Sequence, residues 1–144
     1  MPRRKKQSRA FQKWLEAQDE AFQIWWQGAE CEENGDIKRA IRLYTKAAKL
    51  GEPLAQSNLG NLLDDKVSPN RPSEAVYWYK RAIKSGNENA AWNLAMHYRN
   101  LGTERWYKYW LRVAADMGEK EALKICRRID RHSKTPEKVS RRKR

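Results

Sequence analysis

The sequence lacks the sets of side chains that most catalytic and metal sites need. Among 144 residues only His97 and His132 are histidines, and the two cysteines, Cys31 and Cys126, lie far apart and form no CxxC pair. No HExxH or GxSxG pattern and no glycine-rich phosphate loop occurs. These absences predict a protein that is not an enzyme and that uses no cofactor and no metal ion.

Long apolar runs are also missing, which bears on where the protein works. No stretch approaches the roughly 18 apolar residues that a membrane-spanning helix requires. The basic N-terminus leads into Phe11-Gln12-Lys13-Trp14 and not into the apolar segment of a secretory signal. Two widely separated cysteines are typical of reduced thiols. We therefore expect a cytoplasmic protein without a membrane span, or a nuclear one if its source is a eukaryote.

Glycine and proline are scarce, whereas residues that favour helices are abundant. The chain has seven Gly and five Pro, and it is rich in Ala, Leu, Glu, Lys and Arg. The abundant residues have high helix propensity. Hydrophobic residues make up 40% of the chain, which is enough for a core if they recur on one face of each helix. This composition predicts an all-α protein of one domain.

Positive charge is concentrated at the two ends of the chain. Of the net charge of +13, residues 1–13 supply six Lys or Arg and no acid, and residues 124–144 supply ten against two acids. Blocks of like charge usually stay solvated, but they also attract phosphate backbones. We expect disordered tails at 1–13 and 132–144 around a helical domain at 14–131. The tail residues that would contact nucleic acid or an acidic surface are Arg3, Arg4, Lys5, Lys6, Arg141, Arg142, Lys143 and Arg144.

A ladder of small residues occurs twice in full and a third time in part. Its spacing is 7, 4, 4 and 4 residues, and successive copies are shifted by 35 and 32 residues. Five positions that match at one register indicate an internal repeat. The copies are Ala40, Ala47, Gly51, Ala55, Leu59; then Ala75, Ala82, Gly86, Ala90, Leu94; then Tyr107, Ala114, Gly118, Ala122, Cys126.

Each repeat is expected to contain two helices, because apolar residues recur with helical period on both sides of each ladder glycine. Glycine commonly follows the last turn of a helix. Since no pair can bury its apolar face alone, the pattern predicts a right-handed α-solenoid of antiparallel helix pairs. The expected helices span 21–33, 37–50, 53–64, 73–85, 88–100, 104–117 and 119–131, with a further start near Ser8. They form repeats at 21–52, 53–87 and 88–118 and a capping helix at 119–131.

Several residues around the ladder match a known repeat pattern. They are Leu43-Tyr44-Thr45-Lys46-Ala47-Ala48, Gly51, Ala55 and Asn58-Leu59-Gly60, then Trp78-Tyr79-Lys80-Arg81-Ala82, Gly86, Ala90 and Asn93-Leu94. Over about residues 21–126 the chain resembles the Sel-one-like repeat (SLR) family of the tetratricopeptide-like superfamily. The third copy departs from the pattern and resembles a capping unit. The resemblance implies a curved helical stack that holds other proteins or peptides.

In stacks of this kind the first helix of each pair lines the concave side. The face of these helices that points away from the core is therefore the expected partner-binding surface, and it is expected to run from acidic to basic. Trp92 is the main anchor candidate, because Trp dominates many binding hot spots; the alternative is that it packs in the core. The expected surface residues are Gln23, Gln27, Ser57, Asn61, Trp92, Met96, Arg99, Lys124 and Arg128.

Two functions fit these observations. The first is a monomeric scaffold or adaptor that binds a protein or peptide partner in its concave groove, as an immunity-type or effector-adaptor protein would. The alternative is a nucleic-acid-associated protein whose basic tails bind nonspecifically. Stacking of bases on aromatic side chains would need aromatic and basic residues close together. The aromatic residues lie in the nearly neutral middle, apart from the basic tails, which counts against the alternative.

Overall fold

The computed structural model describes residues 9–133 and, within them, all side chains except those of residues 10–12, 14 and 15. Its elements are α1 (Arg9–Glu33), α2 (Ile37–Lys49), α3 (Pro53–Asn61), a π-helical turn η1 (Leu62–Lys66), α4 (Pro72–Lys84), α5 (Glu88–Asn100), α6 (Glu104–Asp116) and α7 (Lys120–Ser133). This range contains no strand. The prediction of an all-α fold is confirmed.

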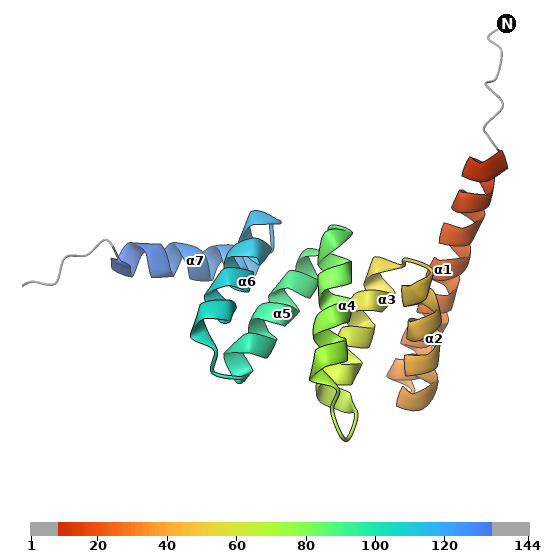
Figure 1. Ribbon diagram of the computed structural model, residues 1–144, viewed down its shortest axis with the longest axis horizontal. Coiled ribbons are helices and arrows are strands. Elements are labelled where there is room, and N and C mark those ends of the chain that lie inside the picture. Colours follow the sequence, from red (N-terminus) through yellow and green to blue (C-terminus); the bar gives the residue numbers. More distant parts are fainter. Residues whose placement is uncertain (1–8, 134–144) are drawn as a thin grey trace, which may run out of the picture.

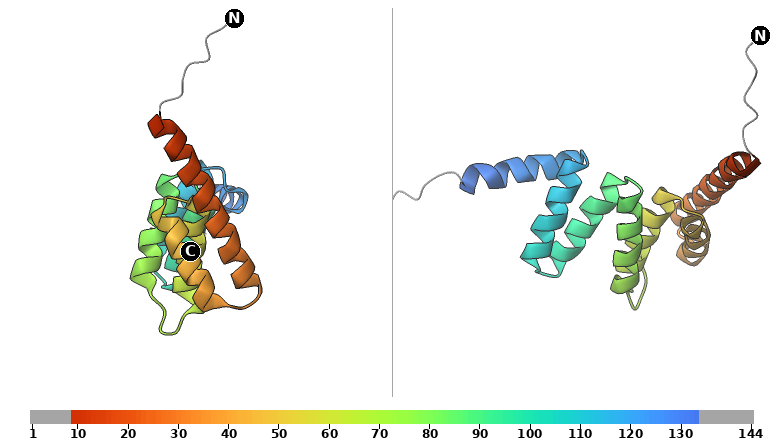
Figure 2. Two further views of the ribbon diagram at one scale, coloured as in Figure 1. Left: turned by 90° about the vertical axis from the view of Figure 1, so that its right-hand side faces the viewer. Right: turned by 45° about the horizontal axis from the view of Figure 1, so that its top comes forward.

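The helices form an elongated stack with α1 at one end and α7 at the other (Figure 1). The most extensive contacts join α1 with α2, α3 with α4, and α5 with α6, whereas contacts between successive pairs are fewer. The last helix, α7, packs on α6. The first turns of α1 extend beyond the rest of the stack (Figure 2). The molecule is thus an α-solenoid of helix pairs with one closing helix, as the sequence predicts.

Side chains cap the starts of several helices in the stack, including α2 and α5. The Asp36 carboxylate accepts a hydrogen bond from the Arg39 backbone N–H at 3.1 Å at the start of α2. The Asn87 side-chain oxygen accepts one from the Ala90 N–H at 2.9 Å at the start of α5. Each bond satisfies an N–H that has no partner within the helix. These local bonds explain why both helices begin where the sequence predicts.

The glycines of the ladder end the even-numbered helices in a left-handed backbone conformation. The φ angle is +99° at Gly51, +89° at Gly86 and +102° at Gly118, a region that other residues rarely enter. The residue after each glycine then donates its N–H to the carbonyl of the ladder alanine four positions before the glycine. These bonds reach Ala47 at 3.1 Å, Ala82 at 3.0 Å and Ala114 at 2.9 Å. The Ala–Gly part of the ladder is therefore a repeated C-terminal capping motif.

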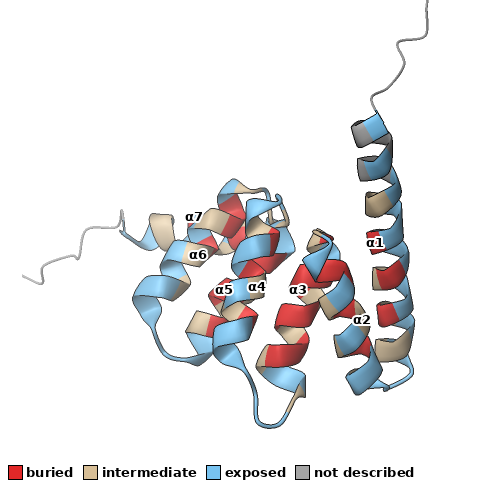
Figure 3. Ribbon diagram, turned by 45° about the vertical axis from the view of Figure 1, so that its right-hand side comes forward, coloured by how far each residue is buried: buried red, intermediate tan, exposed pale blue. Residues whose placement is uncertain are grey.

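The ladder alanines also set the distance between helices. Ala47, Ala82 and Ala114 are fully buried, so their small side chains allow neighbouring helix axes to approach closely. Buried residues lie along the surfaces where helices face each other, and α3 has them on most of its turns (Figure 3). They form two clusters, one reaching from α1 to α5 and one from α5 to α7. The core is thus a continuous layer along the stack.

Several predicted boundaries differ from the structure. The expected helix at 21–33 and the further helix near Ser8 are one 25-residue helix, so residues 9–13 belong to α1 and not to a tail. The expected helix at 53–64 changes to a π-helical turn at Leu62. Helix α7 continues to Ser133, two residues past the expected end. The remaining tail residues, 1–8 and 134–144, lie outside the described range.

Candidate partner-binding face

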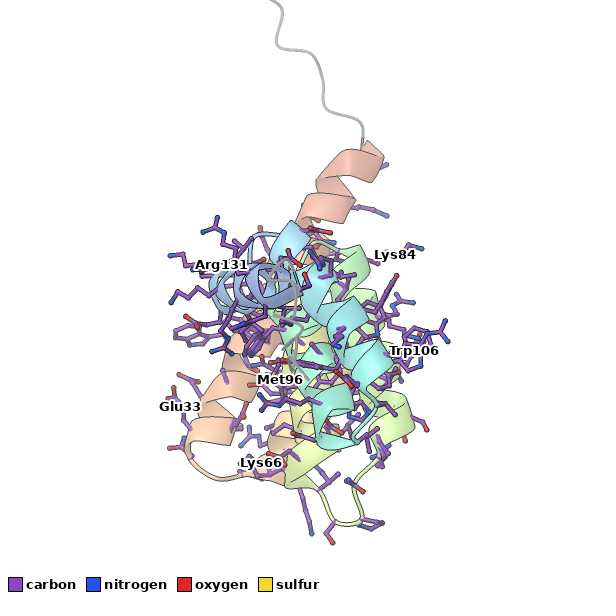
Figure 4. All side chains as sticks on the ribbon, turned by 90° about the vertical axis from the view of Figure 1, so that its left-hand side faces the viewer. Glu33, Lys66, Lys84, Met96, Trp106 and Arg131 are labelled. Carbon is purple, nitrogen blue, oxygen red and sulfur yellow. The ribbon has the colours of Figure 1, made fainter. Side chains whose placement is uncertain are left out.

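The helices alternate between two sides of the stack. Figure 4 views the stack from its α7 end, with Glu33 of α1 and Arg131 of α7 on one side and Lys84 of α4 and Trp106 of α6 on the other. We call the side of the stack on which α1, α3, α5 and α7 are exposed the odd-helix face, and the opposite side, on which α2, α4 and α6 are exposed, the even-helix face. The odd-helix face is the surface on which the sequence predicts partner binding.

Two glycines fix which residues of α1 and α3 occupy equivalent positions. An added Cβ at Gly28 would lie 2.7 Å from the Tyr44 ring, and one at Gly60 would lie 2.6 Å from the Tyr79 ring. Each glycine therefore lies directly beneath a tyrosine of its own helix pair. This geometry aligns α1 with α3 at a shift of 32 residues, so that Phe22 corresponds to Leu54 and Trp26 to Asn58.

The register of α1 places Gln23 and Gln27 away from the side of the stack on which α3 and α5 are exposed. Their equivalents in α3 are Ala55 and Leu59, which are 0% and 1% exposed because they pack toward the preceding pair. Helix α1 has no preceding pair, so both glutamines are exposed on the end of the stack.

Exposed aromatic side chains occupy the α1 part of the odd-helix face instead. Phe22 is 48% exposed and Trp26 is 55% exposed. Their rings lie 5.1 Å and 6.0 Å, respectively, from the ring of Trp25, which packs against the core. Exposed large apolar side chains that cluster in this way commonly mark a binding site. The sequence prediction missed them, although their spacing of four residues places them on one side of a helix.

The middle of the odd-helix face is formed by side-chain amides in a hydrogen-bonded network. Asn61 Oδ1 accepts hydrogen bonds from the Tyr79 hydroxyl at 2.8 Å and from Asn93 Nδ2 at 2.9 Å. Asn58 Nδ2 donates to the Tyr44 hydroxyl at 3.0 Å. Ser57, which was expected here, is only 4% exposed; its prediction is wrong because this position of α3 turns inward.

Trp92 and Met96 lie at the α5 part of this face, but both are half-buried and pack against the second core cluster. Trp92 occupies the position of the inward-turned Ser57 one repeat earlier. The alternative expectation, that Trp92 packs in the core, therefore holds for a large part of the Trp92 side chain. Arg99 is exposed at the last turn of α5.

Basic residues surround a hollow at the α7 end. The hollow has a volume of about 610 Å³ and is lined by Glu121, Lys124, Ile125, Arg128, Arg131 and His132. Lys124 Nζ pairs with Glu121 at 2.6 Å, and the hydrogen bond to this carboxylate raises the pKa of Lys124. The structure thus brings Lys124 and Arg128, two of the predicted residues, to one open site.

The two buried tyrosines of the repeat stay neutral at physiological pH. Burial raises the pKa of Tyr44, and its hydrogen bond to Glu32 at 2.7 Å raises it further. Burial also raises the pKa of Tyr79, with a further contribution from the negative charges of Asp64 and Asp65. Neutral hydroxyl groups can both donate and accept, which lets these tyrosines join the core to the amides of the odd-helix face.

One histidine and the acidic side chains are the candidates for a chemical site in the described part of the chain. His97 is 6% exposed, and its Nδ1 lies 2.9 Å from Asp64 Oδ1, so it is a buried histidine that pairs with a carboxylate. No group of three or more His, Cys, Asp or Glu side chains among residues 9–133 is placed to hold a metal ion. No helix in that range is both long and apolar enough to cross a membrane.

Comparison with known proteins identifies the repeats. Residues 25–52 and 53–87 match the Sel1 repeat family. A 64-residue stretch, 44% of this chain, is 36% identical to an F-box protein of Arabidopsis thaliana. A crystal structure with an SLR fold, that of a protective antigen from uropathogenic Escherichia coli strains, is similar over 71% of this chain, with a TM-score of 0.62 and 26% identity.

The chain spans 18% of the F-box protein and 24% of the bacterial antigen, so it corresponds to a small part of either. Sel1 repeats generally mediate interactions between proteins and are typically not enzymes. The matched segments contain the glycine–tyrosine contact and the capping motif described above. The chain therefore contains two Sel1-like repeats, at residues 25–52 and 53–87, within a helical stack that resembles the SLR fold.

Proposed function

We propose that this protein is a non-enzymatic scaffold that binds an extended segment of a partner protein along its odd-helix face. The observation that supports this most directly is the change in chemistry along the face. Exposed Phe22 and Trp26 lie at the α1 end, side-chain amides lie in the middle, and Lys124 and Arg128 line the hollow at the α7 end. An aromatic anchor and a cationic site at opposite ends would fix the direction of a bound segment.

The amides in the middle suit a peptide backbone. Asn93 Nδ2 donates to Asn61 Oδ1, and within residues 9–133 no further hydrogen bond is found for the Asn61 side-chain N–H group or for the Asn93 side-chain oxygen. Both residues are half-buried, so a bound strand would find one donor and one acceptor already held in place. Such preorganisation lowers the entropy lost on binding.

The partner segment should have an apolar or aromatic residue at one end and acidic residues at the other. The acidic end would pair with Lys124 and Arg128, and the apolar end would cover Phe22 and Trp26. An immunity-type protein would use this face to hold a toxin, and an adaptor would use it to hold an effector. Both roles need the same kind of contact.

Selection from a random peptide library displayed on phage tests this proposal. Peptides selected on the full chain should combine an aromatic or aliphatic residue with several Asp or Glu. Binding of the selected peptides should weaken about tenfold or more in Arg128→Glu and in the double variant Phe22→Ala/Trp26→Ala, because hot-spot residues at interfaces often contribute this much.

The matched control is Tyr77→Ala, which removes an equally exposed aromatic ring on the even-helix face. It should leave the affinity unchanged. Peptides without acidic residues, or peptides that bind Arg128→Glu as tightly as the unaltered chain, would show that the odd-helix face is not the binding surface.

A further inference from the structure

On the even-helix face, the large apolar side chains that α4 and α6 expose are all aromatic. Tyr77 in α4 is 51% exposed, and Trp106 and Tyr109 in α6 are 46% and 53% exposed. They are the only exposed large apolar side chains of these two helices, so this surface has aromatic faces but no exposed aliphatic residues. A surface that docks a folded protein would ordinarily include aliphatic side chains as well.

Trp106 and Tyr109 belong to a continuous series of ring contacts that begins at Tyr98 of α5 and continues along α6. From ring centre to ring centre, Tyr98 lies 6.1 Å from Trp106, Trp106 lies 5.8 Å from Tyr109, and Tyr109 lies 5.0 Å from Trp110. Lys80 of α4 then lies over the Trp110 ring with its Nζ at 5.9 Å. The last contact joins the two helices into one surface.

Cationic side chains alternate with the rings. Arg105 lies over Trp106 and Arg81 lies over Tyr77, each with its guanidinium carbon 5.9 Å from the ring centre. No carboxylate in the described part of the chain pairs with Lys80, Arg81 or Arg105, whereas Lys108 pairs with Glu104 at 2.6 Å. The expectation that aromatic and basic residues are not interleaved is therefore wrong for α4 and α6.

Further cations extend this surface along α4. A hollow of about 580 Å³ beside the α2–α3 turn is lined by Tyr77, Lys80, Arg81 and Lys84, together with Gly51, Gln56 and Ser85. Lys84 and Trp106 lie on the same side of the molecule in Figure 4. The positive charge therefore continues past the rings and outlines a path across two helix pairs.

We propose that this aromatic–cation strip, formed by Tyr77, Lys80, Arg81, Arg105, Trp106 and Tyr109, binds single-stranded nucleic acid. Every nucleobase has a π-face, so bases stack on exposed rings with little sequence preference. The phosphates pair with Lys80, Arg81 and Arg105, which have no carboxylate partner in residues 9–133. Alternating rings and cations match a polymer that alternates bases and phosphates. This binding uses the side of the stack opposite to the proposed protein-binding face.

The experiment must separate the strip from the basic termini, which attract any polyanion. The full chain is titrated with a fluorescent oligothymidylate of about 16 nucleotides, the upper range for one small binding module. The same titration uses an abasic oligonucleotide with the same number of phosphates. The termini bind both through phosphates, so tighter binding of oligothymidylate measures base stacking. We expect about a tenfold preference for oligothymidylate, because each stacked base contributes about that much.

The double variant Trp106→Ala/Tyr109→Ala keeps only Tyr77 of the three exposed rings, so it should lower this preference severalfold and leave the affinity for the abasic oligonucleotide unchanged. Phe22→Ala/Trp26→Ala, which removes two exposed rings from the opposite face, is the control and should keep the preference. Circular dichroism checks that all variants keep their helices.

Three results would overturn the proposal. They are equal binding of the two oligonucleotides by the unaltered chain, an unchanged preference in Trp106→Ala/Tyr109→Ala, and complete displacement of oligothymidylate from the strip by an equally charged polyglutamate. The last result would indicate a docking surface for an acidic protein segment.

Discussion

The contact between glycine and tyrosine shows how single residues determine the spacing of a helix pair. Gly28 lies beneath Tyr44 and Gly60 beneath Tyr79, too close to tolerate an added methyl group without movement. In the third pair the equivalent residues are Ala95 and Leu111, both buried in the second cluster. A larger residue on the first helix is thus matched by a smaller one on the second. The two positions act as one packing unit.

Gly60→Ala should therefore destabilise the protein by about 1–3 kcal/mol through overpacking against Tyr79. Tyr79→Leu alone should also destabilise it, because it removes the hydrogen bond to Asn61 and leaves a gap. The double variant reproduces the Ala–Leu pair of the third repeat. It should be more stable than the sum of the single changes predicts, by about 1 kcal/mol or more. Urea denaturation of all four proteins measures this coupling, and strictly additive effects would contradict the packing unit.

The buried tyrosines also connect stability with pH. The pKa of both Tyr44 and Tyr79 is raised in the folded chain, whereas tyrosine in an unfolded chain titrates near pH 10. Above that pH the unfolded chain has lost protons that the folded chain still holds. The free energy of unfolding then falls as the pH rises. The stabilisation is complete below about pH 10 and is lost progressively above it.

Each of these tyrosines should contribute a slope of up to about 1.4 kcal/mol per pH unit above pH 10. The double variant Tyr44→Phe/Tyr79→Phe should be less stable at neutral pH, because it loses the hydrogen bonds of both hydroxyl groups. Its stability should nevertheless depend less on pH between about pH 9.5 and 11.5. Urea denaturation across that range measures both slopes. A slope equal to that of the unaltered chain would mean that these hydroxyl groups do not control alkaline unfolding.

At the scale of helices, local signals in the sequence define most boundaries. Helix α5 spans Glu88–Asn100, the same residues as its prediction, and most other ends lie within two residues of their predictions. The reason is that caps and left-handed glycines are formed by neighbours in the sequence. The π-helical turn after Asn61 has no such signal, because it depends on how α3 packs against α4. The sequence predicts two helices where the structure has the single helix α1. The first turns of α1 project beyond the stack, so they lack the neighbouring helices that give other helices apolar residues on two sides.

Asn87→Ala tests the cap of α5. The side chain of Asn87 accepts the Ala90 N–H bond at 2.9 Å, and its loss should cost about 1 kcal/mol. Asn87→Ser keeps a side-chain oxygen at the same position and should cost much less. Thermal unfolding followed by circular dichroism compares the two variants. Equal destabilisation would indicate that the packing of the Asn87 side chain, and not the cap, matters.

The binding surfaces could be predicted only in part, because they depend on which neighbours a helix has. Lys124 and Arg128 were found since α7 closes the stack and its outer residues stay open. Gln23 and Gln27 were not placed at the end of the stack, because a helical period does not show which side of a helix faces that end. The strip on α4 and α6 was missed because the net charge of a sequence segment does not show which cations lie over rings. Lys80, for example, lies over the Trp110 ring of another helix.

For the whole molecule, the stack makes stability a property of neighbouring helices. Most contacts join successive elements, so each pair is supported mainly by the pairs beside it. The first cluster ends at α5 and the second begins there, with Ile83 and Trp110 bordering both. A change in one cluster should therefore weaken its own end of the stack most. Such a molecule need not unfold as one cooperative unit.

Leu111→Ala should reveal this gradient in native-state hydrogen exchange. Leu111 is 1% exposed in the second cluster, and its truncation should cost about 2–5 kcal/mol by leaving a cavity. Protection should fall most in α6 and α7, less in α4 and α5, and least in α1 and α2, because the loss passes only through neighbouring interfaces. Leu59→Ala, in the first cluster, is the matched variant and should lower protection most in α2, α3 and α4. If both variants lower protection equally in every helix, the stack unfolds as a single unit and its stability does not depend on nearest neighbours alone.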